Sequence, residues 1–237
     1  MPPFLLSRRL VFPPPELADP DGLLAIGGDL SPTRLILAYS QGIFPWFSEG
    51  DPILWWTPSP RLILIPAEFH LPRRLARTIR GGRFAISADT AFAQVIAGCA
   101  AAPGRGPDNT WITPAMQQAY IRLHTLGFAH SIECRQDGQL VGGLYGVCLD
   151  RVFFGESMFS LVRDASKVAL AALVQEALAR KIALIDCQVS SNHLLGFGAR
   201  EVSRAHFQSL LAAHIDDCRP QPPWRITPRS YASSSNS

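Results

Sequence analysis

The segment Leu140–Gln188, LVGGLYGVCLDRVFFGESMFSLVRDASKVALAALVQEALARKIALIDCQ, decides the fold class of this chain. It begins with two apolar runs, Leu140–Leu149 and Val152–Met158, whose short connection predicts an antiparallel β-hairpin. Val168–Arg180 is apolar on almost every side, which is typical of a buried helix, and Leu184–Gln188 follows as a further strand. Antiparallel strands that lead into a buried helix and another strand predict an α+β domain.

The residues before this segment divide into two regions of different character. The first sixty are rich in Pro and Gly, and a helix start with Ser as N-cap is readable only at Ser31-Pro32. From Leu62 onward the expected elements are strands at Leu62–Ile65, Phe84–Ala88 and Ala129–Cys134 and helices at Pro72–Arg80, Thr90–Ala100, Pro114–Leu126 and Arg204–His214. We therefore predict a small irregular N-terminal domain over 1–61, an α+β domain over 62–229 and a disordered Ser-rich tail over 230–237.

The composition excludes several classes of protein. Hydrophobic residues make up 47% of the 237 residues, which excludes disorder as the main state, and no apolar run approaches the roughly 18 residues of a membrane span. The 22 basic and 19 acidic residues give a net charge of +3, which does not decide whether the partner is a nucleic acid. The five cysteines form no CxxC pair, so we expect no metal site and no disulfide framework. The N-terminal residues 1–15 contain no apolar core long enough for a signal peptide, and we expect a cytoplasmic protein.

Two tryptophans, Trp46 and Trp111, lie in segments flanked by Pro or Thr, away from the periodic apolar faces. Partly buried packing is the commoner role of a lone Trp, and the residues alone favour it. Two such rings in separate loops could also form a stacking surface for a nucleic-acid base. Trp55 and Trp56 carry no such indication, and for them we expect packing.

Two segments carry polar residues that are candidates for chemistry, and the carboxylate in the first of them must be solvated, paired or functional. Glu156 follows a strand of large apolar residues, where an isolated buried carboxylate would be costly. Asp186 and Gln188 stand two apart on a predicted strand, so alternation places both on one face and Cys187 on the other. The pair is either an exposed strand end or a group that binds and orients a cationic amine. Cys187, with His193 six residues later, is a weaker candidate for catalysis, because a free Cys usually packs as a small apolar residue.

A basic cluster accompanies the helix predicted at Pro72–Arg80. No acidic residue interrupts its five arginines, which are Arg73, Arg74, Arg77, Arg80 and Arg83. Most such runs are solvated helix faces, but a dense unpaired cluster is also typical of phosphate contacts. The residues alone leave these two interpretations open.

Several segments of the chain are too specific to be ordinary connections. They are GIFPWF (Gly42–Phe47), ILWWTPSPR (Ile53–Arg61), TWIT (Thr110–Thr113), LVGGLYGV (Leu140–Val147), FFGESMFS (Phe153–Ser160), DASK (Asp164–Lys167) and LIDCQ (Leu184–Gln188). Together, from about Leu5 to Trp224, the chain resembles the leucyl/phenylalanyl-tRNA–protein transferase family, the bacterial N-end-rule aminoacyltransferases.

The resemblance implies an enzyme, with a fold and an activity. The larger domain is expected to have the acetyltransferase-like (GNAT-type) fold. The expected reaction moves Leu or Phe, and less well Met, from aminoacyl-tRNA to the N-terminal Arg or Lys of acceptor proteins, which marks those proteins for degradation. No cofactor or membrane is involved, and we expect a monomer.

The resemblance also implies roles for particular residues. Trp46 and Trp111 are expected to hold the terminal adenosine of the donor, and the basic helix to grip the acceptor stem of the tRNA. Asp186, Gln188 and Glu156 are the expected catalytic residues. The donor side chain would enter an apolar pocket formed by Leu144, Phe153, Met158, Ser160, Leu173 and Ile185. The family often has Met where this chain has Leu144, which leaves the preference between Leu and Phe open.

General pKa values shape the expected mechanism. A protein α-amine, with a pKa of about 7.7–8.0, is partly neutral near neutral pH and can attack the activated ester. An Asp with its ordinary pKa of about 3.9 is a poorly matched base. We therefore expect Asp186 to position the amine, and to accept its proton partly through Gln188, without a covalent intermediate.

Two other functions remain as alternatives. One is an N-acetyltransferase that uses acetyl-CoA, but that fold needs a Gly-rich turn for the pyrophosphate, and the connection 158–164 contains no glycine. The other is a non-catalytic RNA-binding module, which would leave the three polar residues unexplained.

Overall fold

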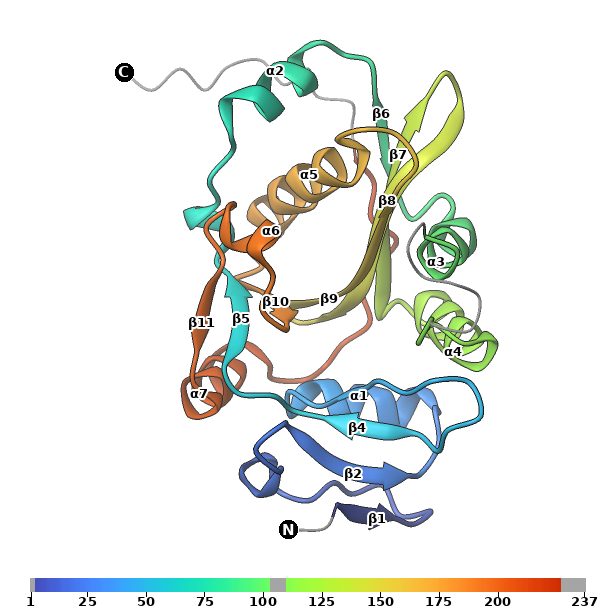
Figure 1. The fold of residues 1–237 in the computed structure, drawn as a ribbon, viewed down its shortest axis with the longest axis vertical. Coiled ribbons are helices and arrows are strands. Elements are labelled where there is room, and N and C mark those ends of the chain that lie inside the picture. Colours follow the sequence, from blue (N-terminus) through green and yellow to red (C-terminus); the bar gives the residue numbers. More distant parts are fainter. Residues whose placement is uncertain (1–2, 103–109, 227–237) are drawn as a thin grey trace.

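The computed structural model describes residues 3–102 and 110–226, so the expected tail at 230–237 lies outside the described residues. A seven-stranded sheet dominates it, with the strand order β11-β5-β10-β9-β8-β7-β6 (Figure 1). Its strands are β5 (Arg61–Leu64), β6 (Ala85–Ala88), β7 (Ala129–Gln136), β8 (Gln139–Leu149), β9 (Val152–Ser160), β10 (Leu184–Gln188) and β11 (Arg200–Val202). The helices associated with the sheet are η2 (Pro66–Glu68), α2 (Arg73–Arg80), α3 (Phe92–Ala100), α4 (Pro114–Thr125), α5 (Ala165–Ala179), α6 (Asn192–Leu195) and α7 (Arg204–His214). The predicted strands and helices of this part are confirmed, with ends shifted by at most three residues.

The N-terminal part is more regular than expected. It contains a four-stranded sheet of order β1-β2-β4-β3, formed by β1 (Phe4–Leu6), β2 (Leu23–Gly27), β3 (Phe44–Pro45) and β4 (Leu54–Trp56), together with η1 (Pro15–Leu17) and α1 (Pro32–Ser40). Sequence patterns missed these strands because each spans only 2 to 5 residues, too few for alternation to stand out. The predicted helix start is present, since Ser31 Oγ accepts the Arg34 N–H at 3.4 Å.

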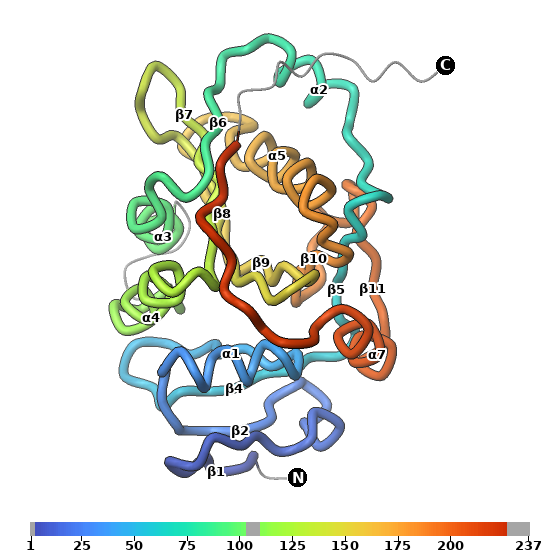
Figure 2. The backbone as a smooth tube through the Cα atoms, turned by 180° about the vertical axis from the view of Figure 1, so that it is seen from behind, coloured from blue at the N-terminus to red at the C-terminus, as the bar shows by residue number. Residues whose placement is uncertain are grey.

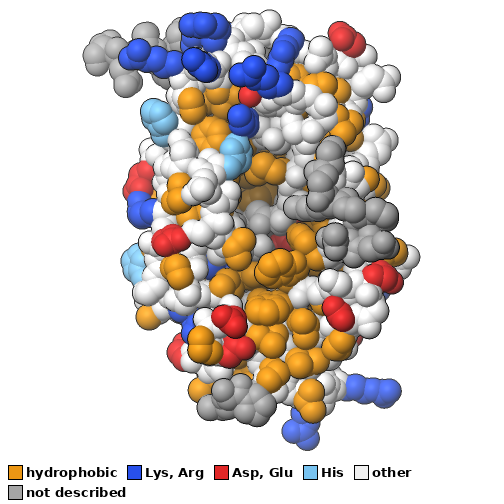
Figure 3. All heavy atoms as spheres, in the orientation of Figure 1, with side chains coloured by type: hydrophobic (Ala, Val, Ile, Leu, Met, Phe, Trp, Pro, Cys, Tyr) orange, Lys and Arg blue, Asp and Glu red, His pale blue; other side chains and the backbone are white. Residues whose placement is uncertain are grey.

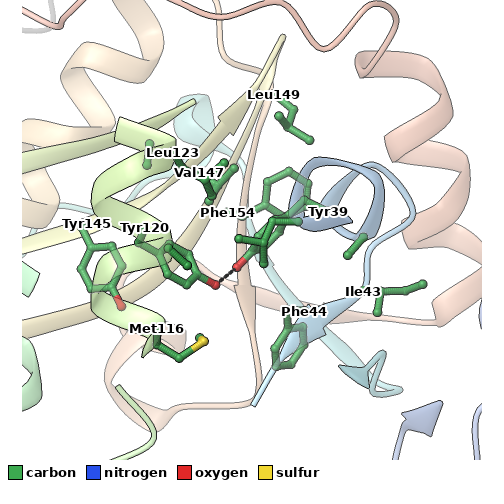
Figure 4. Close-up of a cluster of buried hydrophobic side chains, with 14 of the residues drawn as sticks. Tyr39, Ile43, Phe44, Met116, Tyr120, Leu123, Tyr145, Val147, Leu149 and Phe154 are labelled. Carbon is green, nitrogen blue, oxygen red and sulfur yellow. Dashed lines mark hydrogen bonds between the residues drawn. The ribbon is translucent and has the colours of Figure 1, made fainter. Parts of the chain in front are cut away.

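The two faces of the large sheet are covered differently. On one face, α5 and α2 pack over a core that includes Leu75, Leu173 and Ile185. On the other face, α3 and α4 share a core with α1, so Tyr39 of the N-terminal part packs beside Phe154 of β9 (Figures 1 and 4). The N-terminal part therefore completes the core of the large sheet.

The C-terminal segment beyond α7 crosses the back of the molecule (Figure 2). Its Trp224 is buried, stacks on His130 with 4.4 Å between ring centroids, and donates its backbone N–H to Asp89 Oδ2 at 2.6 Å. None of the described helices is both long and apolar enough to cross a membrane.

One irregularity of the sheet creates the space for the functional site. Strands β9 and β10 are its one parallel pair among the described residues, and their pairing ends at Phe154 and Asp186. Directly afterwards each strand has a register shift against its other neighbour, which leaves Glu156 and Cys187 as the extra residues of two β-bulges. Without further pairing the two strands separate, and a cavity lies between their carboxyl ends.

Candidate active site

The cavity has a volume of about 420 Å³ and lies within the hollowed face of Figure 3, where apolar side chains gather. Most of its lining is apolar or aromatic. The lining residues are Phe44, Pro45, Trp46, Trp111, Leu144, Tyr145, Phe153, Gly155, Glu156, Ser157, Met158, Leu170, Leu173, Ile185, Asp186, Cys187, Gln188, Val189, Ser191, His193 and Leu194. An apolar cavity with a few convergent polar groups is the usual form of a small-molecule or substrate site.

Glu156 is the polar centre of the cavity. Its Oε1 accepts hydrogen bonds from Tyr39 Oη at 2.7 Å and from Gln188 Nε2 at 2.9 Å. Its Oε2 is buried and has no hydrogen-bond partner among the described residues. Burial raises the pKa of Glu156 from its ordinary value of 4.5 to about 7, although its hydrogen bonds act in the opposite direction. Near neutral pH this carboxylate can therefore both accept and release a proton.

Two tyrosines support Glu156 from the side of α1 and α4. The hydroxyls of Tyr39 and Tyr120 are hydrogen-bonded to each other (Figure 4). Burial, and next the charge of Glu156, raise the pKa of both phenols well above 10. Both therefore remain neutral, and Tyr39 acts as a donor to the carboxylate.

Asp186 lies beneath the cavity in a buried ion pair. Arg61 Nε donates to its Oδ1 at 2.8 Å and Arg61 Nη2 to its Oδ2 at 2.6 Å, and neither side chain is exposed. Its Oδ1 also accepts the backbone N–H of Gln188 at 2.9 Å. Both carboxylate oxygens of Asp186 therefore already accept hydrogen bonds. Asp186 acts on the cavity mainly through its contact with the backbone N–H of Gln188.

The prediction that Asp186 and Gln188 simply share a strand face needs a correction. The bulge at Cys187 interrupts the alternation, and Gln188 has a φ of +63°. Its side chain turns to Glu156, whereas that of Asp186 meets Arg61. Cys187 packs against the core under α5, and burial raises the pKa of its thiol, as expected for a packing residue.

Trp46 and Trp111 come together at the cavity from two different loops. Trp46 is 44% exposed, and its ring centroid lies 5.9 Å from that of Trp56, whose Nε1 donates to the Trp46 carbonyl at 2.8 Å. Trp55 is fully buried and bonds the Gly27 carbonyl, in agreement with its predicted packing role. The partly exposed indole of Trp46 is therefore supported by Trp56, as a stacking surface requires.

Five of the six predicted pocket residues line the cavity, namely Leu144, Phe153, Met158, Leu173 and Ile185. Ser160 does not line it. Its Oγ donates to the Val162 carbonyl at 2.8 Å and accepts the Ser166 N–H at 3.2 Å, because the chain turns at this point from β9 into α5. The hydroxyl is thus used by the turn and not by the cavity.

The five arginines of the basic cluster are all exposed and none lines the cavity. Four lie on α2, which buries Leu75 and Ile79 against α5, and blue side chains gather over this end of the molecule in Figure 3. Arg83 differs, since its Nη2 donates to the Arg163 carbonyl at 2.7 Å. The cluster is therefore a separate surface beside the cavity helix α5.

The start of α5 is poorly suited to an acetyl-CoA pyrophosphate. The connection from β9 contains no glycine, and the residue directly before the helix is Asp164, whose carboxylate lies 3.4 Å from Lys167 Nζ. A carboxylate beside a helix N-terminus lowers the affinity of that end for a second anion, because the two negative charges repel each other.

Comparisons with known proteins identify the family of this chain. The family model for leucyl/phenylalanyl-tRNA protein transferase matches residues 63–212, and the model for the N-terminal domain of the same family matches residues 28–59. A leucyl/phenylalanyl-tRNA–protein transferase of Desulfatibacillum aliphaticivorans is 56% identical over 211 residues, which is 89% of this chain and 91% of that protein. The corresponding protein of Pseudomonas putida is 54% identical over 90% of this chain and 95% of its own length.

A solved structure resembles the chain more distantly. A GCN5-related N-acetyltransferase from Kribbella flavida matches with a TM-score of 0.40 at 11% identity, over 70% of this chain and 59% of that one. The family models and the relatives define the class as an aminoacyltransferase with a small N-terminal domain, which here precedes a larger α+β part. In particular, the chain belongs to the leucyl/phenylalanyl-tRNA–protein transferase family, as the sequence motifs predict.

Proposed function

We propose that this transferase moves Leu or Phe, and less well Met, from aminoacyl-tRNA to the N-terminal Arg or Lys α-amine of acceptor proteins and so creates a degradation signal. The observation that carries the proposal is Glu156 Oε2, a buried oxygen with no partner among the described residues, at the centre of an apolar cavity. An incoming amine can complete the hydrogen bonding of this oxygen. We further propose that the enzyme works as a monomer, in the cytoplasm.

In the proposed reaction the α-amine attacks the ester carbonyl carbon of the aminoacyl group. The new amide bond forms as the bond to the ribose oxygen breaks, the amine loses a proton and the leaving oxygen gains one. Glu156, with a pKa of about 7, is well matched to an amine of pKa about 7.7–8.0 and takes the proton. The Arg61 ion pair supports the positioning role that the sequence predicts for Asp186, while Glu156 takes the proton that was expected to pass to Asp186 partly through Gln188. Gln188 holds the Glu156 carboxylate.

The donor occupies the apolar part of the cavity. Its side chain lies among Leu144, Phe153, Met158, Leu173 and Ile185, and its adenine ring stacks on Trp46 and Trp111. An apolar pocket distinguishes one methylene by only about 1–3 kcal/mol, which is why Met is a poor but detectable donor. A charged donor side chain is rejected because its burial would be unpaired.

The arginines of α2 contact phosphates of the tRNA acceptor stem in this proposal. These arginines are exposed and form no ion pair with an acidic residue in the described part of the chain, which supports counterion release when phosphates bind. Replacing Arg77 and Arg80 by Ala should weaken the use of intact charged tRNA and flatten its salt dependence, but leave an aminoacyl-adenosine donor nearly unaffected. Replacing Arg8 and Arg9, which are exposed in the N-terminal part, is the matched control.

The proposal is tested by incubating the protein with radiolabelled Leu-tRNA and two peptides that differ only in an N-terminal Arg or Ala. Label should enter the Arg peptide and not the Ala peptide, and radiolabelled Asp-tRNA should label neither. Equal labelling of both peptides would refute the acceptor assignment. RNA binding without any transfer would assign the chain to a binding module instead.

A further inference from the structure

Arg61 is a fully buried cation at the junction of the N-terminal part and the large sheet. As the first residue of β5 it is fixed in the sheet, where its neighbours Leu62 and Ile63 pair with Gln188 and Asp186 of β10. Its guanidinium also lies between two aromatic rings, 4.8 Å from the centroid of Phe44 and 4.7 Å from that of Phe207. Backbone pairing and the two rings thus fix the position of the fork that holds Asp186.

Folding stability alone gives little reason for this buried ion pair. Burying two charges is often no more favourable than packing apolar residues in the same space. In addition, Arg61 Nη1 is buried without a hydrogen-bond partner among the described residues. A role beyond folding is therefore indicated, and the contacts of Asp186 show where it acts.

Those contacts lead directly to the cavity. Asp186 Oδ1 accepts both Arg61 Nε at 2.8 Å and the backbone N–H of Gln188 at 2.9 Å. Gln188 has a φ of +63°, a conformation that a residue with a side chain adopts only when its surroundings enforce it. From this position its Nε2 reaches Glu156 Oε1 at 2.9 Å. The Asp186 carboxylate is the side-chain contact that holds this turn, beside the pairing of Gln188 with Leu62, and Arg61 holds the carboxylate.

We infer that Arg61 is a positioning residue of the transfer reaction, which acts through Asp186 to hold Gln188 against Glu156. The inference rests on the proposed function of Gln188 and Glu156 at the acceptor amine. It assigns the rigid two-donor fork of Arg61 a task that a lysine ammonium cannot perform, since a point charge does not fix both carboxylate oxygens.

The first test compares Arg61→Lys with Arg34→Lys. Arg34 is the matched control, because it is also fully buried and paired, with Asp29 at 3.2 Å, but its partner Asp29, unlike Asp186, does not line the cavity. Both variants should lose thermal stability. Only Arg61→Lys should lower kcat for transfer to an Arg-initiated peptide, on the order of 10- to 100-fold, with the KM for an aminoacyl-adenosine donor unchanged.

The second test asks whether Arg61 acts through Gln188. In a Gln188→Ala background the additional effect of Arg61→Lys on kcat should largely disappear, because the side chain that Arg61 positions is gone. Equal effects of Arg61→Lys in both backgrounds would overturn the inference.

The third test covers the case in which Arg61→Lys does not fold. The double variant Arg61→Met/Asp186→Leu replaces the ion pair by apolar packing and should regain much of the stability. Its transfer activity should stay low, because the Gln188 N–H has lost its acceptor. Recovery of both stability and activity would show that the pair serves folding alone. If the unmodified enzyme transfers no label, the proposed function fails and this inference fails with it. If the unmodified enzyme transfers label and Arg61→Lys transfers it equally well, only this inference fails.

Discussion

Glu133 of β7 and Glu156 of β9 are both buried carboxylates of the same sheet, but their hydrogen bonding differs. Glu133 is fully satisfied: Ser131 Oγ donates to its Oε1 at 2.6 Å, and Ser87 Oγ and Thr90 Oγ1 donate to its Oε2 at 2.6 and 2.8 Å. Glu156 has two donors on Oε1 and none among the described residues on Oε2. The first arrangement ties three parts of the fold together, and the second leaves one oxygen for a ligand.

The difference separates two uses of a buried carboxylate. A saturated one has no capacity to bind anything further, so its substitution is expected to affect folding. A carboxylate in a cavity with one oxygen that accepts no hydrogen bond is not fully compensated for its lost hydration, which is why the pKa of Glu156 rises to about 7. That cost can be recovered when a substrate amine binds.

The largest expected effect is that of Glu156→Gln on the transfer rate. Gln keeps the size of the side chain and its acceptor oxygen, but it cannot take a proton. Single-turnover transfer near neutral pH should slow by about 10²–10⁴-fold, with little change in the affinity for an aminoacyl-adenosine donor. A rate equal to that of the unmodified enzyme would remove the distinction between the two glutamates.

The same substitution should have the opposite effect on stability. The pKa of Glu156 is raised on folding, so its ionisation destabilises the folded state progressively as pH rises from about 4.5 to about 7. Glu156→Gln removes this loss. The two proteins should have similar unfolding free energies near pH 4, and above pH 7 the variant should be more stable by roughly 3 kcal/mol. Urea unfolding at both pH values measures the difference, and a variant that is less stable at high pH would contradict it.

Glu133→Gln should show the reverse pattern, with a smaller effect. In Gln an NH₂ group replaces one carboxylate oxygen, and NH₂ cannot accept the hydrogen bond that a hydroxyl now donates to that oxygen. One buried hydroxyl donor is then left without an acceptor, at a cost of about 1–3 kcal/mol. The midpoint of urea unfolding should fall, while kcat at a temperature where the variant is folded should remain within about twofold of normal. A large loss of kcat without a loss of stability would place Glu133 in the site.

The sequence could reveal those site residues whose polarity differs from that of their neighbours along the chain. Glu156, Asp186 and Gln188 are polar residues within apolar strands, and α5 is recognisable because its apolar residues surround the helix. The strands of the N-terminal sheet are too short for such a signal. Local patterns therefore located the strands of the site but not its internal contacts.

The residues that were missed act over long sequence distances. Arg61 pairs with a residue 125 positions away and Tyr39 with one 117 positions away, so no local pattern connects them. A possible signal existed for Arg61, because it directly precedes the apolar run Leu62–Ile65. The two bulges, which separate β9 from β10 and turn Gln188 toward Glu156, depend on pairing that alternation within one strand does not contain.

The smallest expected effect is that of Tyr39→Phe on the pKa of Glu156. Tyr39 donates to Glu156 Oε1 at 2.7 Å and thereby lowers a pKa that burial raises. Tyr39→Phe removes this donor and keeps the ring that packs on Phe154. The pKa of Glu156 should rise, so the increase of transfer rate with pH should shift upward by about one pH unit, which corresponds to the loss of one hydrogen bond to a charged group.

Rates between about pH 5.5 and 9, measured by single-turnover transfer, would reveal the shift. In a Glu156→Gln background the same Tyr39→Phe change should leave the pH profile unmoved, because no carboxylate remains for Tyr39 to stabilise. A shift that persists in that background would show that another group controls the profile, and the open oxygen of Glu156 would then no longer account for the chemistry that distinguishes it from Glu133.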